Sequence, residues 1–242
     1  HWGTFGFFGP ITVLPEYWNR KVAQALLERT MSVFDDWGIT HRGLFTFPDS
    51  PKHVHLYEKY GFQPGQRISV LDKEVSPGPE EACTRLSGLS VQDRQNAIRA
   101  CGELTREILD GLDVEKELRA VLDQQLGEIC LIYEGESLVA FAICHCGSDT
   151  EAGDDTCYVK FGATRSSAKE GRHFASLLRA CEAVALERSL PILSVGMNTG
   201  RQKAYSHLVN SGFQTRLMGL AMETHPERSY NRPEVYVIDD WR

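Results

Sequence analysis

Two thirteen-residue stretches decide the fold: residues 50–62 read SPKHVHLYEKYGF and residues 201–213 read RQKAYSHLVNSGF. In each, a helical pattern runs into Gly-Phe, a common way for a helix to stop. A separation of 151 residues relates the two stretches, and it also relates Leu-Leu at 26–27 to Leu-Leu at 177–178. We interpret this gap-free match over helix, strand, helix and strand as an internal duplication.

The helix before each stretch carries an apolar stripe with the spacing i, i+3, i+4, i+7, i+10 and i+11. Its members are Ala23, Leu26, Leu27, Thr30, Val33 and Phe34 in one helix and Phe174, Leu177, Leu178, Cys181, Val184 and Ala185 in the other. Because such a stripe faces a core, we expect both helices to be buried against a sheet. The alternative is that amphipathic helices resemble one another by chance.

The sequence indicates one domain boundary. Its 242 residues are enough for two cores, and Ser-Pro-Gly-Pro at 76–79 interrupts helix and strand alike. We predict a first domain at 1–75, a linker at 76–89 and a second domain at 90–242. The predicted class is α/β (α+β), with a mixed, mostly antiparallel twisted sheet flanked by helices in each domain.

The predicted elements follow the same order in both halves. Strands are expected at 4–13, 43–47, 67–73, 128–133, 137–145, 156–162, 192–197, 215–222 and 235–238. Helices are expected at 19–37, 51–60, 171–188 and 201–210, with two or three more between 90 and 125. Because the chain opens on a strand-like run, we expect residues before His1, or another segment, to complete the first sheet.

Composition limits the class of protein. Acidic residues outnumber basic ones by 33 to 26, which argues against chain-wide attraction to nucleic acid or an anionic membrane. No apolar run approaches the roughly 20 residues of a membrane-spanning helix. The seven cysteines show no regular disulfide spacing, so we expect reduced thiols in a cytoplasmic protein. A homodimer is left open.

Together with Val13-x-Pro15 and a basic turn, the stretch at 50–62 resembles the second half of a GNAT-superfamily acetyltransferase domain. The stretch at 201–213 resembles the same half in a more diverged form. The resemblance covers residues 4–73 and, more weakly, 127–240. It implies the GNAT fold, in which two helices and three antiparallel strands precede this half. It also implies acetyl coenzyme A as the acyl donor and an amine as the acceptor.

A diphosphate such as that of coenzyme A needs converging N–H donors, which the first turn of a helix supplies. The resemblance assigns donor binding to Thr12, Val13, Arg20, Lys21, Val22, Ala23, Gln24 and Ser50. In the family pattern Arg/Gln-x-x-Gly-x-Gly/Ala, Lys21 stands where a glycine lets phosphate approach. Its side chain must therefore point away, or its ammonium must replace the lost contact. A solvated helix start is the alternative.

Tyr57 occupies the position at which GNAT members carry the acid that protonates the departing thiolate. A phenol has a reference pKa of about 10 and a thiol one of about 8.5, so a positioned tyrosine donates at little cost. The second copy has Leu208 there, which cannot donate. The alternative for Tyr57 is simple packing of its ring. No carboxylate in the strand at 4–13 offers a base, and Glu16 reads as a solvated turn residue.

The second copy fits a donor less well, because Glu170 would repel phosphate and Phe174 replaces the small residue. We therefore predict an N-acetyltransferase that transfers acetyl directly to a small-molecule or peptide amine. The first copy would be catalytic and the second a scaffold or lid. The alternative is a non-catalytic tandem module that binds coenzyme A, a metabolite or a protein. A transferase for a longer acyl chain is a third reading.

Cys144, His145 and Cys146, with Cys130 and Cys157 on neighbouring strands, could converge on zinc. Strand alternation, however, places His145 on the opposite face from its two neighbours. We therefore predict buried thiols and no metal.

Three acidic pairs, at 35–36, 154–155 and 239–240, read as solvated turn or edge charges. The aromatic residues of 230–242 are expected to anchor the C-terminus.

Overall fold

The computed structural model describes residues 1–9, 11–78, 81–225, 230–239 and 241. Its strands are β1 (Phe5–Phe8), β2 (His41–Thr46), β3 (Gln63–Glu74), β4 (Thr84–Arg85), β5 (Gly127–Glu134), β6 (Ser137–Gly147), β7 (Gly153–Thr164), β8 (Ile192–Asn198), β9 (Gln214–Glu223) and β10 (Val237–Ile238). Its helices are α1 (Val22–Asp36), α2 (Pro51–Glu58), α3 (Val91–Ile108), α4 (Glu115–Asp123), α5 (Glu170–Glu187) and α6 (Gln202–Asn210). Short 3-10 turns lie at Pro15–Tyr17 and Leu86–Gly88.

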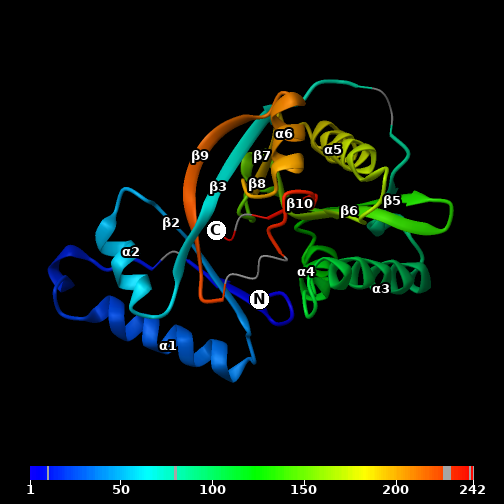
Figure 1. The fold of residues 1–242 in the computed structure, drawn as a ribbon. Helices are drawn as coiled ribbons and strands as arrows, with labels where there is room; N and C mark the ends of the chain where they lie inside the picture. Colours follow the sequence, from blue (N-terminus) through cyan, green and yellow to red (C-terminus); the bar gives the residue numbers. More distant parts are fainter. Residues whose placement is uncertain (10, 79–80, 226–229, 240, 242) are drawn as a thin grey trace.

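A single twisted sheet joins the strands of the described residues, in the order β1-β2-β9-β3-β8-β7-β6-β5-β4, with β10 attached to β7 (Figure 1). Two strands have exchanged places in this order. β9, from the end of the chain, lies between β2 and β3, and β3, from its beginning, lies between β9 and β8. Each half of the chain therefore contributes a strand to the sheet of the other half, giving the mixed α/β architecture that the sequence predicts.

The exchange has local two-fold symmetry. At the centre of the antiparallel β3–β9 ladder, Ile68 pairs with Gly219, and these two residues are 151 positions apart. The flanking pairs, Arg67 with Leu220 and Ser69 with Met218, are each other's counterparts at the same offset. The axis therefore passes through the central pair.

The offset of 151 holds for the other ladders too. The parallel β1–β2 ladder begins at Phe5↔His41, and the parallel β7–β8 ladder begins at Thr156↔Ile192. Leu44 of β2 pairs with Met222 of β9, and the counterpart pair in the second half joins Val195 and Leu71. The repeat read from the sequence thus extends to the pairing of individual strand residues.

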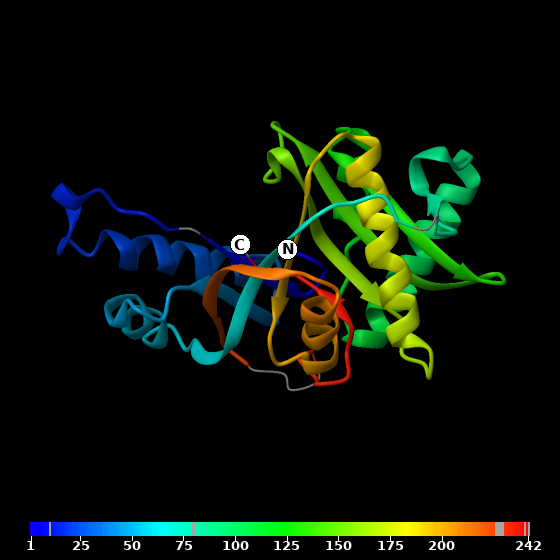
Figure 2. The ribbon, with the colours of Figure 1, turned by 90° about the horizontal axis from the view of Figure 1, so that it is seen from above.

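Helices cover the sheet in two layers, and Figure 2 shows the first half, with α1 and α2, beside the larger second half. Leu44, Phe62 and Met222 form the core of the first half together with partly buried side chains of α1 and α2. One face of the second half packs against α5 and α6, and the other against α3 and α4. Among the described residues, no helix combines the length and hydropathy needed to cross a membrane.

The apolar stripes have different outcomes in the two halves. All six stripe residues of α5 are buried, as expected. In α1, Leu27 and Phe34 are buried, but Leu26 is 43% exposed, so that part of the prediction is wrong. The reason is the width of the sheet beneath each helix. α5 packs across β5, β6, β7 and β8, whereas in the described chain no strand lies beyond β1.

Two further sequence predictions need correction. The first strand ends at Phe8 rather than at residue 13, because its ladder with β2 stops at Phe8↔Leu44. The segment assigned to a linker contains β4, which pairs with β5. Two residues are too few to show a strand period in the sequence.

Gly219 offers a test of the exchanged ladder. A Cβ at this position would overlap the ring of Phe45, so Gly219→Ala forces the ring to move. We expect the free energy of unfolding to fall by about 1–3 kcal/mol, measured by urea denaturation. Gly78→Ala, which adds a methyl group where no atom lies nearby, is the control. An equal loss from Gly219→Ala in a Phe45→Leu background would contradict this packing.

Candidate functional site

The start of α1 presents unpaired backbone donors. Asn19 and Lys21 both have φ of +61°, and no side chain caps the helix. The first backbone bond into α1 runs from Ala25 N to Lys21 O at 3.0 Å. The N–H groups of residues 22–24 therefore have no acceptor within the helix, and they lie at the positive end of its dipole.

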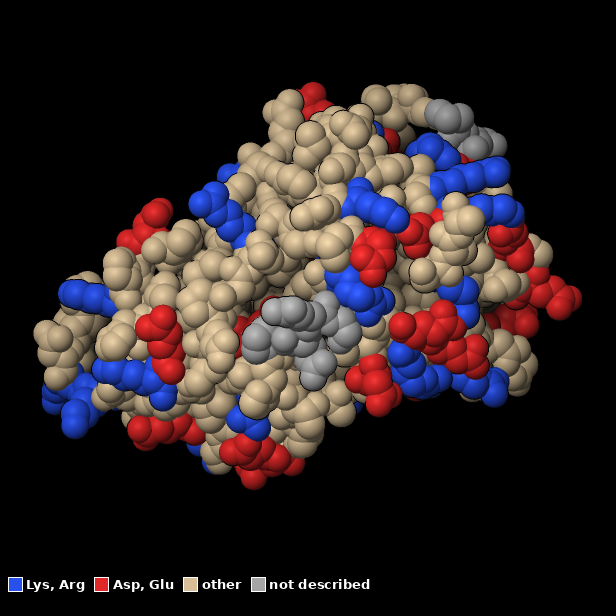
Figure 3. Space-filling view, in the orientation of Figure 1, with Lys and Arg blue, Asp and Glu red and all other residues tan. Residues whose placement is uncertain are grey.

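Basic side chains surround this turn. Arg20 and Lys21 are exposed, and the guanidinium of Arg20 lies 5.5 Å from the centre of the Tyr17 ring. The first turn of α1 contains no acidic residue. In Figure 3, basic side chains are visible at the left-hand tip, over the segment that leads into α1. The turn is thus suited to an anionic group.

The equivalent turn of α5 is occupied by the protein itself. Glu170 lies in its first turn, with its carboxylate 3.4 Å from Ser167 N and 3.5 Å from Lys203 Nζ. The hydroxyl of Tyr236 stands 3.0 Å from where a Cβ of Gly171 would be. An acidic group and an aromatic ring therefore replace the open basic turn of α1.

Beyond the end of β1 the backbone runs beside a gap. The β1–β2 ladder stops at Phe8↔Leu44, while β2 continues to Thr46 along β9. Thr12 and Val13 follow this divergence and have no ladder partner in the part of the chain that the structure describes. The Val13 carbonyl accepts a bond from Trp18 Nε1 at 2.8 Å.

In the second half, β10 fills the corresponding gap. There the β7–β8 ladder ends at Val159↔Val195, and β10 pairs with β7 just beyond it. Gly162 pairs with Ile238, and the chain continues with a bond from Thr164 N to Tyr236 O at 3.1 Å. The two equivalent ladder ends therefore differ, because among the described residues a strand pairs beyond the β7–β8 ladder and none pairs beyond the β1–β2 ladder.

Tyr57 lies in the last turn of α2, on the same face of the sheet as α1. Its ring centre is 6.2 Å from that of Phe8 and 6.5 Å from that of Phe62. Burial raises the pKa of the Tyr57 hydroxyl, so the group is protonated at neutral pH. Among the described residues this hydroxyl has no hydrogen-bond partner, which leaves its proton available.

Ser50 is the N-cap of α2, and its side chain makes no capping bond. It lies seven residues before Tyr57, about 10 Å along the helix axis. The two predicted residues therefore sit at opposite ends of α2 and not at one point.

Tyr60 is a residue of this region that sequence reasoning missed. Its hydroxyl donates to Gln24 O at 3.1 Å and lies 3.4 Å from Glu28 Oε1. This contact ties the end of α2, three residues after Tyr57, to the first turns of α1. The only sequence signal was the i, i+3 spacing of two tyrosines before Gly61.

In the second half, the positions equivalent to Ala23 and Tyr57 hold the larger apolar residues Phe174 and Leu208. Phe174 and Leu208 are completely buried. The Phe174 ring centre is 5.0 Å from that of Tyr236 and 5.4 Å from that of His207. This half presents packed hydrocarbon where the first half presents Ala23 and Tyr57.

A buried charge network holds the C-terminal segment that closes the second gap. Asp239 is 1% exposed and binds Arg201 Nη1 at 2.5 Å, the Tyr230 hydroxyl, and Trp241 Nε1 at 3.2 Å. The prediction that Asp239 is solvated is therefore wrong, because a buried arginine from 201–213 compensates its charge. Asp240 lies outside the described residues. The expected aromatic anchoring is confirmed, since Tyr230 and Trp241 are buried.

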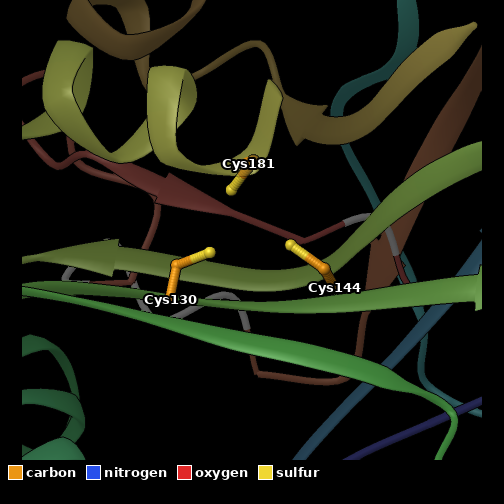
Figure 4. Close-up of side chains that lie close together, drawn as sticks. All are labelled: Cys130, Cys144 and Cys181. Atoms are coloured by element: carbon orange, nitrogen blue, oxygen red, sulfur yellow. The ribbon is translucent and has the colours of Figure 1, made fainter. Parts of the chain in front are cut away.

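Figure 4 shows the sulfur atoms of Cys130, Cys144 and Cys181 pointing toward one another from β5, β6 and α5. They lie within 4.8 Å of one another and are completely buried, a spacing at which three thiolates could share a metal ion. His145 takes no part, as strand alternation predicted. Its Nε2 lies 3.1 Å from Glu117 and its Nδ1 lies 3.2 Å from Glu151.

The sequence of the first half carries a family signature. Residues 1–62 match the sequence model of the acetyltransferase (GNAT) family. Acetyltransferase structures also match nearly the whole chain in three dimensions. The chain has the GNAT fold. The matched 62 residues include every position predicted for donor binding and the predicted acid.

Three solved structures illustrate how far the GNAT fold extends. A proposed acetyltransferase from Pyrococcus horikoshii has a TM-score of 0.69 and 12% identity, with 100% of this chain and 73% of that chain covered. A GCN5-related N-acetyltransferase from Sphaerobacter thermophilus has a TM-score of 0.58 and 16% identity, with 91% and 73% covered. A tandem GNAT protein from the clavulanic acid biosynthesis pathway has a TM-score of 0.55 and 10% identity, with 93% and 77% covered. No curated protein sequence matches the chain.

The backbone of Lys21 can be tested directly. A positive φ costs an L residue about 1–2 kcal/mol, whereas glycine adopts it freely and loses about 0.4–1 kcal/mol through its more flexible unfolded state. We therefore expect Lys21→Gly to be more stable than Lys21→Ala by about 0.5–1 kcal/mol in urea denaturation. Both variants remove the same charge, so each controls for the other. Equal stability, or a less stable glycine variant, would show that the turn is not held at positive φ.

Proposed function

We propose that this protein is an acetyl-CoA-dependent N-acetyltransferase in which the first half of the chain binds the donor and the second half is structural. One observation supports this assignment most strongly. The gap beyond β1 is free of any described strand, whereas β10 fills its counterpart beyond β7. The match of residues 1–62 to the acetyltransferase family supports the same half.

In this proposal the donor lies along the opening of the first half. Its diphosphate accepts hydrogen bonds from the N–H groups of Val22, Ala23 and Gln24, and Arg20 and Lys21 add positive charge. Its pantetheine amides pair with backbone groups of Thr12 and Val13, as an added strand would. The hydroxyl of Ser50 contributes a further contact to the same arm.

The acceptor in this proposal is a small-molecule or peptide amine. Its neutral nitrogen attacks the thioester carbon, so that a C–N bond forms and the C–S bond breaks. The sulfur leaves as a thiolate and takes the proton of Tyr57. The proton lost by the amine nitrogen returns through water to the Tyr57 phenolate. Water is invoked because β1 holds no carboxylate. The Tyr57 hydroxyl, which has no partner among the described residues, and its raised pKa suit a group that keeps its proton until the thiolate appears.

The second half has a supporting role in the proposal. In this half β10 pairs with β7 beyond the end of the β7–β8 ladder, and the buried Phe174 and Leu208 stand at the positions of Ala23 and Tyr57. Its β9 completes the sheet of the first half. The free thiols fit a reducing compartment, and we retain the cytoplasm as the proposed location.

A non-catalytic module that binds coenzyme A is the second candidate. The side chain at the glycine position, Lys21, and the absence of a carboxylate on β1 favour it. Calorimetry separates the two candidates, because a module would bind coenzyme A but release no thiol from acetyl coenzyme A with any amine.

Tyr57→Phe tests the catalytic proposal. Loss of a general acid lowers turnover by about 100-fold or more, while removal of the one hydroxyl leaves donor binding intact. We expect kcat, followed by thiol release, to fall accordingly, with Kd for coenzyme A within about twofold of the wild type. Tyr205→Phe on α6 is the matched control and should change neither value. Unchanged kcat in Tyr57→Phe would contradict the role of Tyr57 as the acid. No thermal shift with millimolar coenzyme A would contradict acetyl coenzyme A as the donor.

A further inference from the structure

A hollow lies at the opposite end of the β7–β8 ladder from the place where β10 pairs with β7. Its volume is about 500 Å³, and the strands β3, β7, β8 and β9 contribute to its wall. The wall includes Asp72, Asp155, Tyr158, Ile192, Ser194 and Arg216. We call this hollow the Asp72 pocket. It has no part in the proposed donor site, and a ligand bound there would serve a purpose other than donor binding.

Two buried oxygen atoms at the Asp72 pocket lack hydrogen-bond partners among the described residues. Ser194 is 3% exposed, and its Oγ has no partner. Asp72 holds Arg216 through Oδ2 at 2.7 Å, but its buried Oδ1 has no partner. Buried polar atoms in folded proteins are almost always paired with protein or water, so these two oxygens accept hydrogen bonds from water or from a ligand that replaces it.

The counterpart of this pocket in the first half shows what such a donor looks like. At an offset of 151 residues, Asp72 corresponds to Glu223 and Ser194 to Gly43. Glu223 is satisfied there, with His41 Nε2 at 2.9 Å from Oε2 and Asn231 Nδ2 at 3.2 Å from Oε1. N–H groups of the chain itself therefore serve this carboxylate.

An aromatic ring covers the counterpart as well. A Cβ on Gly43 would lie 3.0 Å from the ring of Trp241, and the same ring is 5.3 Å from that of Phe5. In the first half, the Trp241 ring and the N–H groups of His41 and Asn231 thus lie where the Asp72 pocket is open in the second half. No described residue does the same over Asp72.

The charges at the Asp72 pocket favour a cation. Arg216 compensates Asp72, and Lys160 and His145 contact Glu151 at 2.9 Å and 3.2 Å. Burial alone would lower the pKa of His145, but its bonds to Glu117 and Glu151 raise it to about 9, so the ring is charged at neutral pH. Asp155 then remains without a cationic partner among the described residues. With Glu117 included, these side chains carry four negative charges and three positive ones, so one negative charge is left uncompensated.

We infer that the Asp72 pocket binds a small organic monocation with a planar apolar body and N–H donors, such as an amidine or a guanidine. Its N–H groups donate to Asp72 Oδ1 and Ser194 Oγ, and its body lies against Tyr158 and Ile192. Asp155 supplies the balancing charge.

Benzamidine is the probe, because it carries this charge and shape and is a poor acetyl acceptor. Isothermal titration of the full chain, without coenzyme A, should show one benzamidine bound. Benzamide, its neutral isostere, should bind at least tenfold more weakly. Asp72→Asn and Ser194→Ala should each weaken benzamidine binding, the former at least tenfold. Asp154→Asn, at an exposed carboxylate beside the pocket, is the matched control and should stay within twofold of wild type.

Several results would overturn the inference. They are no binding at millimolar benzamidine, equal affinity for benzamide, or unchanged affinity in both Asp72→Asn and Ser194→Ala. Because Asp72→Asn also releases Arg216, its fold is checked by urea denaturation, and Ser194→Ala serves as the test if that variant is unstable. Since no donor is present, none of these results bears on the proposed acetyl transfer.

Discussion

The antiparallel ladder between β3 and β9 is the constraint on which the rest of the structure depends. Each of these strands completes the sheet of the half to which it does not belong in sequence. Without the ladder, β3 and β9 would each present an unpaired edge, and backbone groups buried in the sheet would lose their partners. The two halves therefore share a single sheet.

The symmetry of this ladder also explains why the parallel ladders of the two halves end at equivalent residues, although different segments lie beyond the two ends. Both openings follow from the same divergence of two parallel strands, after Phe8 in one half and after Val159 in the other. What distinguishes them is the C-terminal segment. It adds β10 to one opening and is held by the buried Arg201–Asp239 pair. Tyr230 and Trp241 also donate hydrogen bonds to the Asp239 carboxylate, whereas Nε and Nη2 of Arg201 have no partner among the described residues.

Much of the fold was predictable from the sequence because the repeat is gap-free. An offset found in Leu-Leu and Gly-Phe dipeptides extends to Ile68↔Gly219 and to the ladders on either side. The face of His145 followed from strand alternation alone. The exchange of β3 and β9 was not predictable from the sequence. The residue pattern within a strand indicates that it is a strand, but not which half of the chain it pairs with.

The candidate site was less accessible to sequence reasoning. The family pattern places a glycine at position 21, and Lys21 does have the positive φ that glycine favours. The roles of Lys21 in donor binding and of Tyr57 as the acid stay predictions. Asp239 was misread because its partner, Arg201, lies 38 residues earlier. Leu26 was misread because a stripe does not reveal how wide a sheet lies beneath it. The oxygens of Asp72 and Ser194 that lack partners among the described residues come from different strands, so no local sequence pattern marks them.

Hydrogen–deuterium exchange with and without coenzyme A tests the central claim most directly, because it reports on both openings in one experiment. The account predicts slower amide exchange in residues 11–24 when coenzyme A is bound and unchanged exchange in residues 162–174. Slowing confined to residues 162–174, or no slowing in either segment at saturating coenzyme A, would contradict it.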